Sequence, residues 1–336
     1  MGAQARQHLI GTDLAFAAWF QADRHPGRIA LKSAGVASDV LHRRISAHDV
    51  DKAVAAAKRT FENGVWRDLN PRDKKAIMLK WADLIREHYE EIALLETLEV
   101  GKPIGDTSGY DALAVARVIQ WYGEAIDKRY DEIAPAPTNS LAMITREPLG
   151  VIGAIVPWNY PIVIASWKIG PALAMGNSMV LKPSEESSLA ILKIAQLGIE
   201  AGIPKGVFNV VTGLGDQAGQ ALARHMDVAK IAFTGSGPVG KKMLQYAAES
   251  NLKQVALELG GKSPQVVLDD VVDLDKAAST IAWGIYYNSG QTCNAGSRVI
   301  VHESIKAALT AKLAEFVGNF KVGDPLDPTT QMGPVV

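Results

Sequence analysis

Five short apolar runs, separated by segments of helical periodicity, begin near residue 151 and are the strongest constraint on the fold. Strands that are buried on both faces have continuous apolar sequences, and helical crossovers between them force parallel pairing. We therefore expect an α/β fold with a doubly wound, parallel, Rossmann-like sheet and helices on both faces, which binds nucleotides at the carboxyl ends of its strands. The runs are VIGAIV (151–156), SMVLKP (178–183), VFNVV (207–211), AKIAFTG (229–235) and QVALEL (254–259).

The residues that precede these runs are predicted to be mainly helical. A capping-box pattern at Ser46 predicts the start of one helix. Asn70 followed by Pro71 predicts the start of a helical stretch that continues to about Glu99. Further elements are expected at 35–45 (an edge strand), 109–130 (a helix) and 143–146 (a strand).

A second α/β stretch follows residue 261. Strands are expected at 264–270 and 297–303, and helices at 273–287 and 304–319. Two strands and two helices are few for a domain, so we expect this second unit to be incomplete and the chain to be truncated at its C-terminus.

Composition excludes several classes of protein. Hydrophobic residues make up 48% of the 336 residues and charged residues 21%, which is typical of globular rather than disordered chains. The 35 Lys and Arg nearly balance the 36 Asp and Glu, so we expect no nucleic-acid partner. A single cysteine excludes internal disulfides and multi-cysteine zinc sites, and the seven histidines form no metal-spaced pair, so no metal is expected.

The charge-free segment 148–167 is long enough to cross a bilayer. Pro157, Asn159 and Pro161 would interrupt a helix at its centre, where lipid offers the backbone no hydrogen-bond partner. A buried strand, a turn and the start of a helix suit this segment better, so we expect no membrane association. With one cysteine and no recognisable signal peptide, the chain is expected to be cytoplasmic.

Gly235, Gly237 and Gly240 match the pattern G-x-G-x-x-G between an expected strand and an expected helix. In that context the pattern indicates a dinucleotide-binding turn, and a tight turn without a ligand is the alternative. The pattern also requires an acidic residue about twenty positions later, which Glu258 provides. However, the loop follows the fourth expected strand rather than the first, which leaves the assignment of Glu258 to a ribose open.

Cys293 lies in NSGQTCNAGSR, a polar turn between an expected helix and an expected strand. A lone cysteine is most often an inert buried residue, but backbone N–H groups in such a turn can stabilise a thiolate or an oxyanion. A thiolate beside a dinucleotide site points to oxidation of an aldehyde through a thioester. Hydrolysis of the thioester needs a carboxylate base, and Glu258 is a candidate. A Cys–His hydrolase would need a histidine brought close by the fold.

Five motifs resemble those of the aldehyde dehydrogenase superfamily, in the same order and with similar spacing. They are PWNYP (157–161), LKPSE (181–185), FTGSGPVG (233–240), LELGGKSP (257–264) and GQTCNAG (290–296). The resemblance implies an NAD-dependent oxidation of an aldehyde to a carboxylic acid through a cysteine thiohemiacetal and a thioester. It also implies a small-molecule aldehyde as substrate, and a homodimer or homotetramer in the full-length family.

The resemblance also implies roles for individual residues. Cys293 would be the nucleophile, and Glu258 the base that activates the deacylating water. The side-chain amide of Asn159 would join the Cys293 backbone N–H in an oxyanion hole. Lys182 and Glu185 would hold the adenosine ribose, so the assignment of a ribose to Glu258 is given up. The other expected cofactor contacts are Pro157, Trp158, Gly235, Ser236 and Gly240, and Gly237 departs from the family's usual G-S-T turn.

The same resemblance divides the chain into four parts. Residues 1–136 are expected to form the N-terminal helical part of the cofactor domain, and 137–150 an oligomerisation-arm strand. Residues 151–260 would be the Rossmann-like NAD-binding core, and 261–336 an incomplete catalytic domain. The family's E-x-F-G-P motif, whose Glu holds the nicotinamide ribose, does not occur in this sequence. A catalytically inactive truncated fragment or a nucleotide-binding module is therefore the alternative to an active enzyme.

Two stretches and one carboxylate suggest the substrate and the cofactor. LLETLEVGKPIGD (94–106) and WYGEAIDKRYDEIAP (121–135) resemble the branch that oxidises 4-(γ-glutamylamino)butanal and other ω-aminoaldehydes in putrescine degradation. Betaine aldehyde and aromatic aldehydes are the alternative substrates. The Glu185 carboxylate would accept a hydrogen bond from the ribose 2′-hydroxyl and repel a 2′-phosphate, which favours NAD over NADP.

Overall fold

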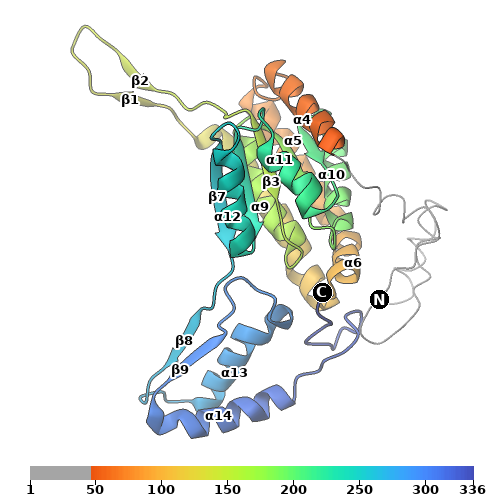
Figure 1. The fold of residues 1–336 in the computed structure, drawn as a ribbon, viewed down its shortest axis with the longest axis vertical. Coiled ribbons are helices and arrows are strands. Elements are labelled where there is room, and N and C mark those ends of the chain that lie inside the picture. Colours follow the sequence, from red (N-terminus) through yellow and green to blue (C-terminus); the bar gives the residue numbers. More distant parts are fainter. Residues whose placement is uncertain (1–46) are drawn as a thin grey trace, which may run out of the picture.

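The computed structural model describes residues 47–336, and a five-stranded parallel sheet forms the centre of its larger unit (Figure 1). The strands are β3 (Val151–Ile155), β4 (Ser178–Lys182), β5 (Phe208–Val210), β6 (Lys230–Gly235) and β7 (Gln254–Leu259). Their order across the sheet is β5-β4-β3-β6-β7. From β3 the chain first adds strands on one side and then returns to add β6 and β7 on the other, so the direction reverses between β3 and β6. This confirms the doubly wound sheet that the apolar runs predict.

The crossover helices lie between the strands, in the segments of helical periodicity that separate the five apolar runs. A short π-helical turn, η3 (Gly215–Gly219), precedes one of them. Between residues 47 and 336, no helix is both long and apolar enough to cross a bilayer. The crossover helices are α9 (Pro161–Ala174), α10 (Leu189–Ala201), α11 (Gln220–Arg224) and α12 (Gly237–Ala248).

The helices before the sheet differ in detail from the prediction. Asn70 caps α5 as expected, because its side-chain oxygen accepts a hydrogen bond from the Arg72 N–H (2.9 Å). The helical stretch beyond it is interrupted at His88. The helix expected at 109–130 is found over 107–128, as a π-helical turn, a 14-residue α-helix and a 3-10 turn in direct succession. The prediction for 35–45 and the cap at Ser46 lie outside the described residues. The elements are α4 (Ala47–Glu62), α5 (Pro71–Glu87), α6 (Tyr89–Val100), α7 (Ile104–Asp106), η1 (Thr107–Asp111), α8 (Ala112–Ala125) and η2 (Ile126–Lys128).

Each face of the sheet packs against its own hydrophobic core. Ile152 and Ala154 of β3 belong to the core shared with α5, α6, α8, α9 and α10. Val151 and Ile155 belong to the core shared with α4, α11 and α12. Because alternate residues of a strand point to opposite faces, two cores require an uninterrupted apolar strand.

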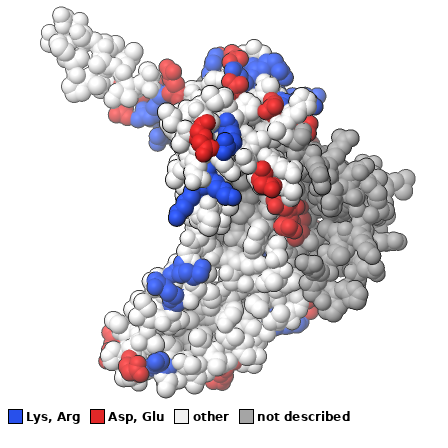
Figure 2. Space-filling view, viewed as in Figure 1, with Lys and Arg blue, Asp and Glu red and all other residues white. Residues whose placement is uncertain are grey.

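A two-stranded hairpin projects from the larger unit (Figure 1). Strand β1 (Glu132–Ala134) pairs in antiparallel fashion with β2 (Ala142–Ile144), so the strand expected at 143–146 is found and its partner was not foreseen. The side chains of Ile133 and Met143 are 76% and 63% exposed. In Figure 2 the tip of the hairpin carries no charged atoms, whereas Lys, Arg, Asp and Glu are interspersed over the rest of the described surface in that view.

The smaller unit follows β7 and contains the elements that the sequence predicts. Its core is small: the cluster at its centre contains three buried side chains, Ala278, Ile281 and Leu309, with partly buried side chains packed against them. The outer face of its two-stranded sheet is open, with Val266 and Ile300 more than half exposed. The elements are β8 (Pro264–Val267), α13 (Leu274–Tyr286), η4 (Tyr287–Gly290), β9 (Arg298–Val301) and α14 (Glu303–Gly318), and β8 and β9 are parallel.

Glu99, near the end of α6, caps the start of α10. Its two carboxylate oxygens accept hydrogen bonds from the backbone N–H groups of Leu189 (2.5 Å) and Ala190 (3.2 Å). Burial raises the pKa of Glu99 to about 7, although these hydrogen bonds act in the opposite direction. The cap therefore changes charge near neutral pH, at the helix that follows Lys182 and Glu185 in the chain.

Replacing Glu99 by Gln should reduce the loss of stability between pH 5 and pH 8. Because its pKa is raised in the folded state, the contribution of Glu99 to the free energy of unfolding is complete below the unfolded pKa and is lost as pH rises through 7. The difference between the two pH values should shrink by on the order of 2 kcal/mol in Glu99→Gln, measured by urea unfolding. The exposed Glu87, changed to Gln, is the control, and equal pH profiles in both variants would contradict the role of Glu99.

Candidate active site

The predicted site residues gather at the carboxyl edge of the sheet. Asn159 follows β3, Lys182 ends β4, Ser236 follows β6 and Glu258 lies near the end of β7. Since all five strands are parallel, these four strand ends lie at one edge, beside the point between β3 and β6 where the strand order reverses. That is where open α/β sheets bind ligands.

Lys182 and Glu185 form an ion pair after β4, with 3.0 Å between Nζ and Oε2. The Lys182 side chain is almost fully buried, whereas that of Glu185 is 43% exposed. Partial burial opposes ionisation of Glu185, but hydrogen bonds from its own backbone N–H and from Lys182 leave its pKa below the ordinary value. An ionised, accessible carboxylate held by a fixed lysine is suited to accept hydrogen bonds from the hydroxyl groups of a ribose.

The glycine-rich turn between β6 and α12 meets the requirements of a phosphate-binding turn. A Cβ on Gly235 would come within 2.5 Å of the Phe233 ring, and one on Gly240 within 2.7 Å of Leu259. The Ser236 side chain makes no capping hydrogen bond, and a Cβ on Gly237 would meet no atom within 4 Å. The first N–H groups of α12 are therefore accessible to an anion, and the residues present fit a dinucleotide. The departure at Gly237 is at an uncrowded position.

The backbone before Cys293 is left-handed over three consecutive residues. Asn288, Ser289 and Gly290 have φ values of 50°, 56° and 74°. Left-handed conformations are costly for residues other than glycine, and Asn is among those that adopt them most readily. The buried Asn288 side chain compensates, because its Nδ2 donates a hydrogen bond to the Asn159 carbonyl (2.9 Å). This bond joins the turn before Cys293 to the loop after β3.

Asn159 is oriented by the segment that carries Cys293. Its Nδ2 donates a hydrogen bond to the Gln291 carbonyl (2.7 Å), which occupies one of its two N–H groups and leaves the other available. Among the described residues, its buried Oδ1 has no hydrogen-bond partner. Asn159 therefore holds one donor in a fixed direction.

Cys293 is exposed, and its carbonyl accepts a hydrogen bond from the Gly261 N–H (3.1 Å). Within the described part of the chain, no hydrogen bond engages the Cys293 N–H. The bond to Gly261 ties the cysteine to the segment directly after Glu258. Three loops thus meet at the cysteine: those after β3 and β7, and the turn after α13.

Glu258 and Lys168 line a groove between α9 and the β6–β7 side of the sheet, together with Trp167 and Ala256. Burial lowers the pKa of Lys168 to about 8, although the charge of Glu258 acts in the opposite direction. The family resemblance implies two alternatives for Lys168, a proton relay or a residue that only caps a packed helix. The structure places it beside the predicted base.

The remaining predicted cofactor residues, Pro157 and Trp158, are partly buried and lie in the loop that carries Asn159. Sequence reasoning missed Tyr160 in the same loop, whose hydroxyl forms a hydrogen bond with Thr292 Oγ1 (3.2 Å). The sequence marks Tyr160 and Thr292 only by their position: each lies in one of the five family motifs, next to Asn159 or Cys293.

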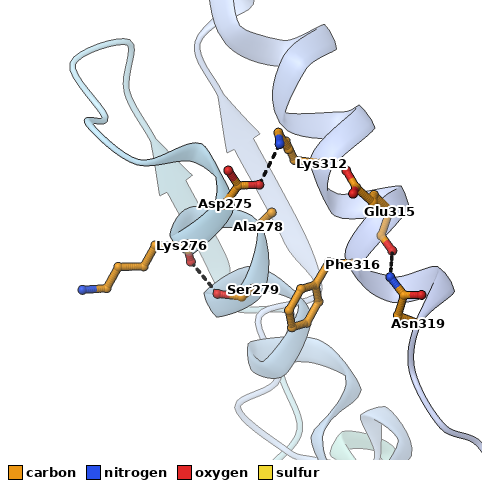
Figure 3. A pocket seen from close by; sticks show the side chains of 8 residues that line it. All are labelled: Asp275, Lys276, Ala278, Ser279, Lys312, Glu315, Phe316 and Asn319. Atoms are coloured by element: carbon orange, nitrogen blue, oxygen red, sulfur yellow. Dashed lines mark hydrogen bonds and ion pairs between the residues drawn. The ribbon is translucent and has the colours of Figure 1, made fainter.

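A second hollow lies between α13 and α14 (Figure 3). Asp275 and Lys312 form an ion pair across it (2.8 Å), and none of the predicted site residues lines it. Over residues 47–336, His, Cys, Asp and Glu form no cluster of three or more that could hold a metal ion.

Comparison with known proteins identifies the family. A model of the aldehyde dehydrogenase family matches residues 39–336. The chain belongs to the aldehyde dehydrogenase family. It is 52% identical over 288 residues to the NADP/NAD-dependent aldehyde dehydrogenase PuuC of Escherichia coli, which is 86% of this chain and 58% of that protein. The chain therefore spans little more than half the length of this relative.

Two solved structures have the same fold over 87% of this chain and 59% of their own length, each with a TM-score of 0.85. One is the γ-glutamyl-γ-aminobutyraldehyde dehydrogenase of Burkholderia cenocepacia, which is 55% identical. The other is an indole-3-acetaldehyde dehydrogenase in complex with NAD+, which is 51% identical.

Replacing Asn288 by Ala should destabilise the turn before Cys293. Alanine adopts the left-handed conformation less readily and cannot donate to the Asn159 carbonyl, so we expect a loss of about 1–3 kcal/mol in the free energy of unfolding. Urea unfolding measures it, with Asn294→Ala as the control because Asn294 is exposed. If the two variants unfold at the same urea concentration, the Asn288 side chain and its hydrogen bond to the Asn159 carbonyl contribute nothing to stability.

Proposed function

We propose that the protein oxidises aldehydes to carboxylic acids with Cys293 as the nucleophile. The observation that carries the proposal is the convergence of three loops on this cysteine, made by the hydrogen bonds of Asn159 and Gly261 to its segment. The relatives in the same family support it. Because the chain covers little more than half of their length, the proposal concerns the site that these residues build.

The residues divide the reaction between them. The Cys293 thiolate attacks the aldehyde carbon, and the free N–H of Asn159 and the Cys293 backbone N–H donate to the oxygen that becomes negative. A nicotinamide cofactor held by Lys182, Glu185 and the N-terminus of α12 would supply the oxidising power, as the acceptor of a hydride from the former aldehyde carbon. Glu258 then removes a proton from water, which attacks the thioester and releases the acid. Lys168, with its pKa lowered to about 8, is suited to relay that proton.

The cofactor would be held at three of the strand ends. Lys182 and Glu185 would accept the adenosine ribose, and the N-terminus of α12 after Ser236 would accept the pyrophosphate. We infer a preference for NAD over NADP, because the Glu185 carboxylate would repel a 2′-phosphate. The related indole-3-acetaldehyde dehydrogenase in complex with NAD+ supports NAD, whereas PuuC is described as using both cofactors.

We propose an ω-aminoaldehyde such as 4-(γ-glutamylamino)butanal as the substrate. The support is the resemblance of 94–106 and 121–135 to that branch, and the 55% identity to a γ-glutamyl-γ-aminobutyraldehyde dehydrogenase. An aromatic aldehyde is the second candidate, because a 51% identical relative acts on indole-3-acetaldehyde. The oligomerisation-arm strand at 137–150, a homodimer or homotetramer in the full-length family and a cytoplasmic location stay predictions.

A nucleotide-binding module without turnover is the second candidate function. The small core of the unit that carries Cys293 and the open face of β8 and β9 favour it, because little holds that unit in place. The cofactor side, by contrast, rests on a sheet with two full cores. NAD binding is therefore expected to survive in the 336-residue chain better than turnover.

NADH formation from NAD and γ-aminobutyraldehyde tests the proposal. We expect slow turnover in the 336-residue chain that Cys293→Ser abolishes. Glu258→Gln should release about one equivalent of NADH and then lower steady turnover by about 10²- to 10⁴-fold, since acylation does not need the base. The exposed Glu200, changed to Gln, is the control. Vigorous turnover would falsify the inactive-module hypothesis, and undiminished turnover in Cys293→Ser would refute the nucleophile.

Replacing Glu185 by Gln should weaken the preference for NAD. Loss of the negative charge removes both a charged hydrogen-bond acceptor for the ribose and the repulsion of a 2′-phosphate, so the ratio of the Kd values for NADP and NAD should fall about tenfold. Titration calorimetry with each cofactor measures the ratio. Glu186→Gln is the matched control. If the ratio of the Kd values changes equally in both variants, Glu185 does not bind the ribose.

A further inference from the structure

We propose that Lys102 is a positioning residue: through Tyr160 it fixes the turn that carries Cys293. The inference rests on the proposed role of Cys293 as the nucleophile. It concerns a buried group of charges that none of the five motifs contains and that the proposed reaction does not use.

Lys102 lies in the interior with two carboxylates. Its side chain and those of Glu96 and Asp111 are fully buried, and its Nζ forms an ion pair with Asp111 and lies 3.9 Å from Glu96. Burial and the charge of Asp111 raise the pKa of Glu96 well above its ordinary value, which favours the neutral form of Glu96. Lys102 and Asp111 form the close ion pair of this group, held away from water.

Such a pair contributes little net stability. Removing two charges from water costs free energy that their attraction only partly repays, and apolar replacements of similar volume are often as stable. In addition, both Glu96 oxygens and Asp111 Oδ1 have no hydrogen-bond partner among the described residues. Stability alone is therefore a poor account of why Lys102 is buried here.

The ammonium group of Lys102 lies 3.7 Å from the centre of the Tyr160 ring. A cation over an aromatic face is strongly attracted when both are shielded from water, which fixes the ring against the cluster. Burial raises the pKa of Tyr160 to about 12, so its hydroxyl stays protonated. That hydroxyl forms the 3.2 Å hydrogen bond with Thr292, the residue directly before Cys293.

These contacts connect the α6–η1 region to the cysteine through one side chain. Tyr160 also follows Asn159 directly, and the turn that Tyr160 holds through Thr292 includes Gln291, whose carbonyl accepts the hydrogen bond from Asn159 Nδ2. When the turn is held, the unpaired backbone N–H groups near Cys293 keep one direction and can stabilise its thiolate. When it is released, these N–H groups no longer keep one direction, and the thiol is expected to react more slowly with an alkylating agent.

Alkylation of the single cysteine with iodoacetamide at pH 7 tests the hydroxyl contact. Thr292→Val removes the partner of Tyr160 at nearly constant volume, and we expect the alkylation rate to fall about fivefold. Thr292→Ser keeps the hydroxyl and should react within about twofold of the parent rate. If Thr292→Val reacts as fast as the parent, or Thr292→Ser as slowly as Thr292→Val, the proposal is wrong.

A second comparison tests the cluster itself. Lys102→Met combined with Asp111→Asn removes both charges together, which avoids leaving one charge buried and unpaired. We expect the same slowing of alkylation and faster hydrogen exchange over 288–296. Lys74→Met is the matched control, because Lys74 is also buried and lies 5.7 Å from the ring centre of Trp66. If Lys74→Met slows alkylation as much as the double variant does, the effect reflects a general loss of structure and the proposal is wrong.

Tyr160→Phe separates the ring from the hydroxyl. It keeps the contact with Lys102 and loses the bond to Thr292, so it should match Thr292→Val, and the two changes combined should slow alkylation no further than either alone. If the double variant slows alkylation by the product of the two single effects, Tyr160 and Thr292 act independently and the proposal is wrong. Alkylation requires neither aldehyde nor cofactor, so these results are independent of the NADH-formation assay that tests the proposed function.

Discussion

The burial of both faces of β3 is the constraint on which the other features depend. Ile152 and Ala154 enter one core, and Val151 and Ile155 enter the other, so neither face can be left to water. Helices must then cover both sides, and the connections between strands must cross over. Parallel strands follow, and with them the gathering of four loops at one edge. The site is a consequence of how the sheet is buried.

The two sides of the site are held by different means. The cofactor side rests on the end of a buried strand and on two glycines that no larger residue could replace without displacing Phe233 or Leu259. The cysteine side rests on a few polar contacts. The main ones are two hydrogen bonds from side-chain amides to backbone carbonyls, from Asn159 to Gln291 and from Asn288 to Asn159. Packing fixes the first side, and hydrogen bonds fix the second. Stability and reactivity are therefore expected to respond to different substitutions.

The sequence was sufficient for features that depend on periodicity. All five strands of the sheet, the crossover helices and the elements of the smaller unit lie within a few residues of their predicted positions. Strand β1 escaped prediction because its three residues are largely exposed and have no apolar period. The contact between Lys102 and Tyr160 joins residues far apart in the chain, and no local pattern marks it. The left-handed φ of Ser289 could not be foreseen either, because serine rarely adopts it, whereas asparagine at 288 is compatible with it without requiring it.

The three left-handed residues before Cys293 also determine the course of the backbone beyond them. In a right-handed helix such as α13, each N–H binds the carbonyl four residues earlier. That succession ends at Tyr287, whose extended backbone (ψ 136°) follows the last helical residue, Tyr286, and the left-handed run from Asn288 to Gly290 then keeps the chain from resuming the helix. The amide of Cys293 therefore lies outside any helix and remains without a partner in the described chain. The course of the backbone, rather than any side chain, leaves this donor free for a ligand.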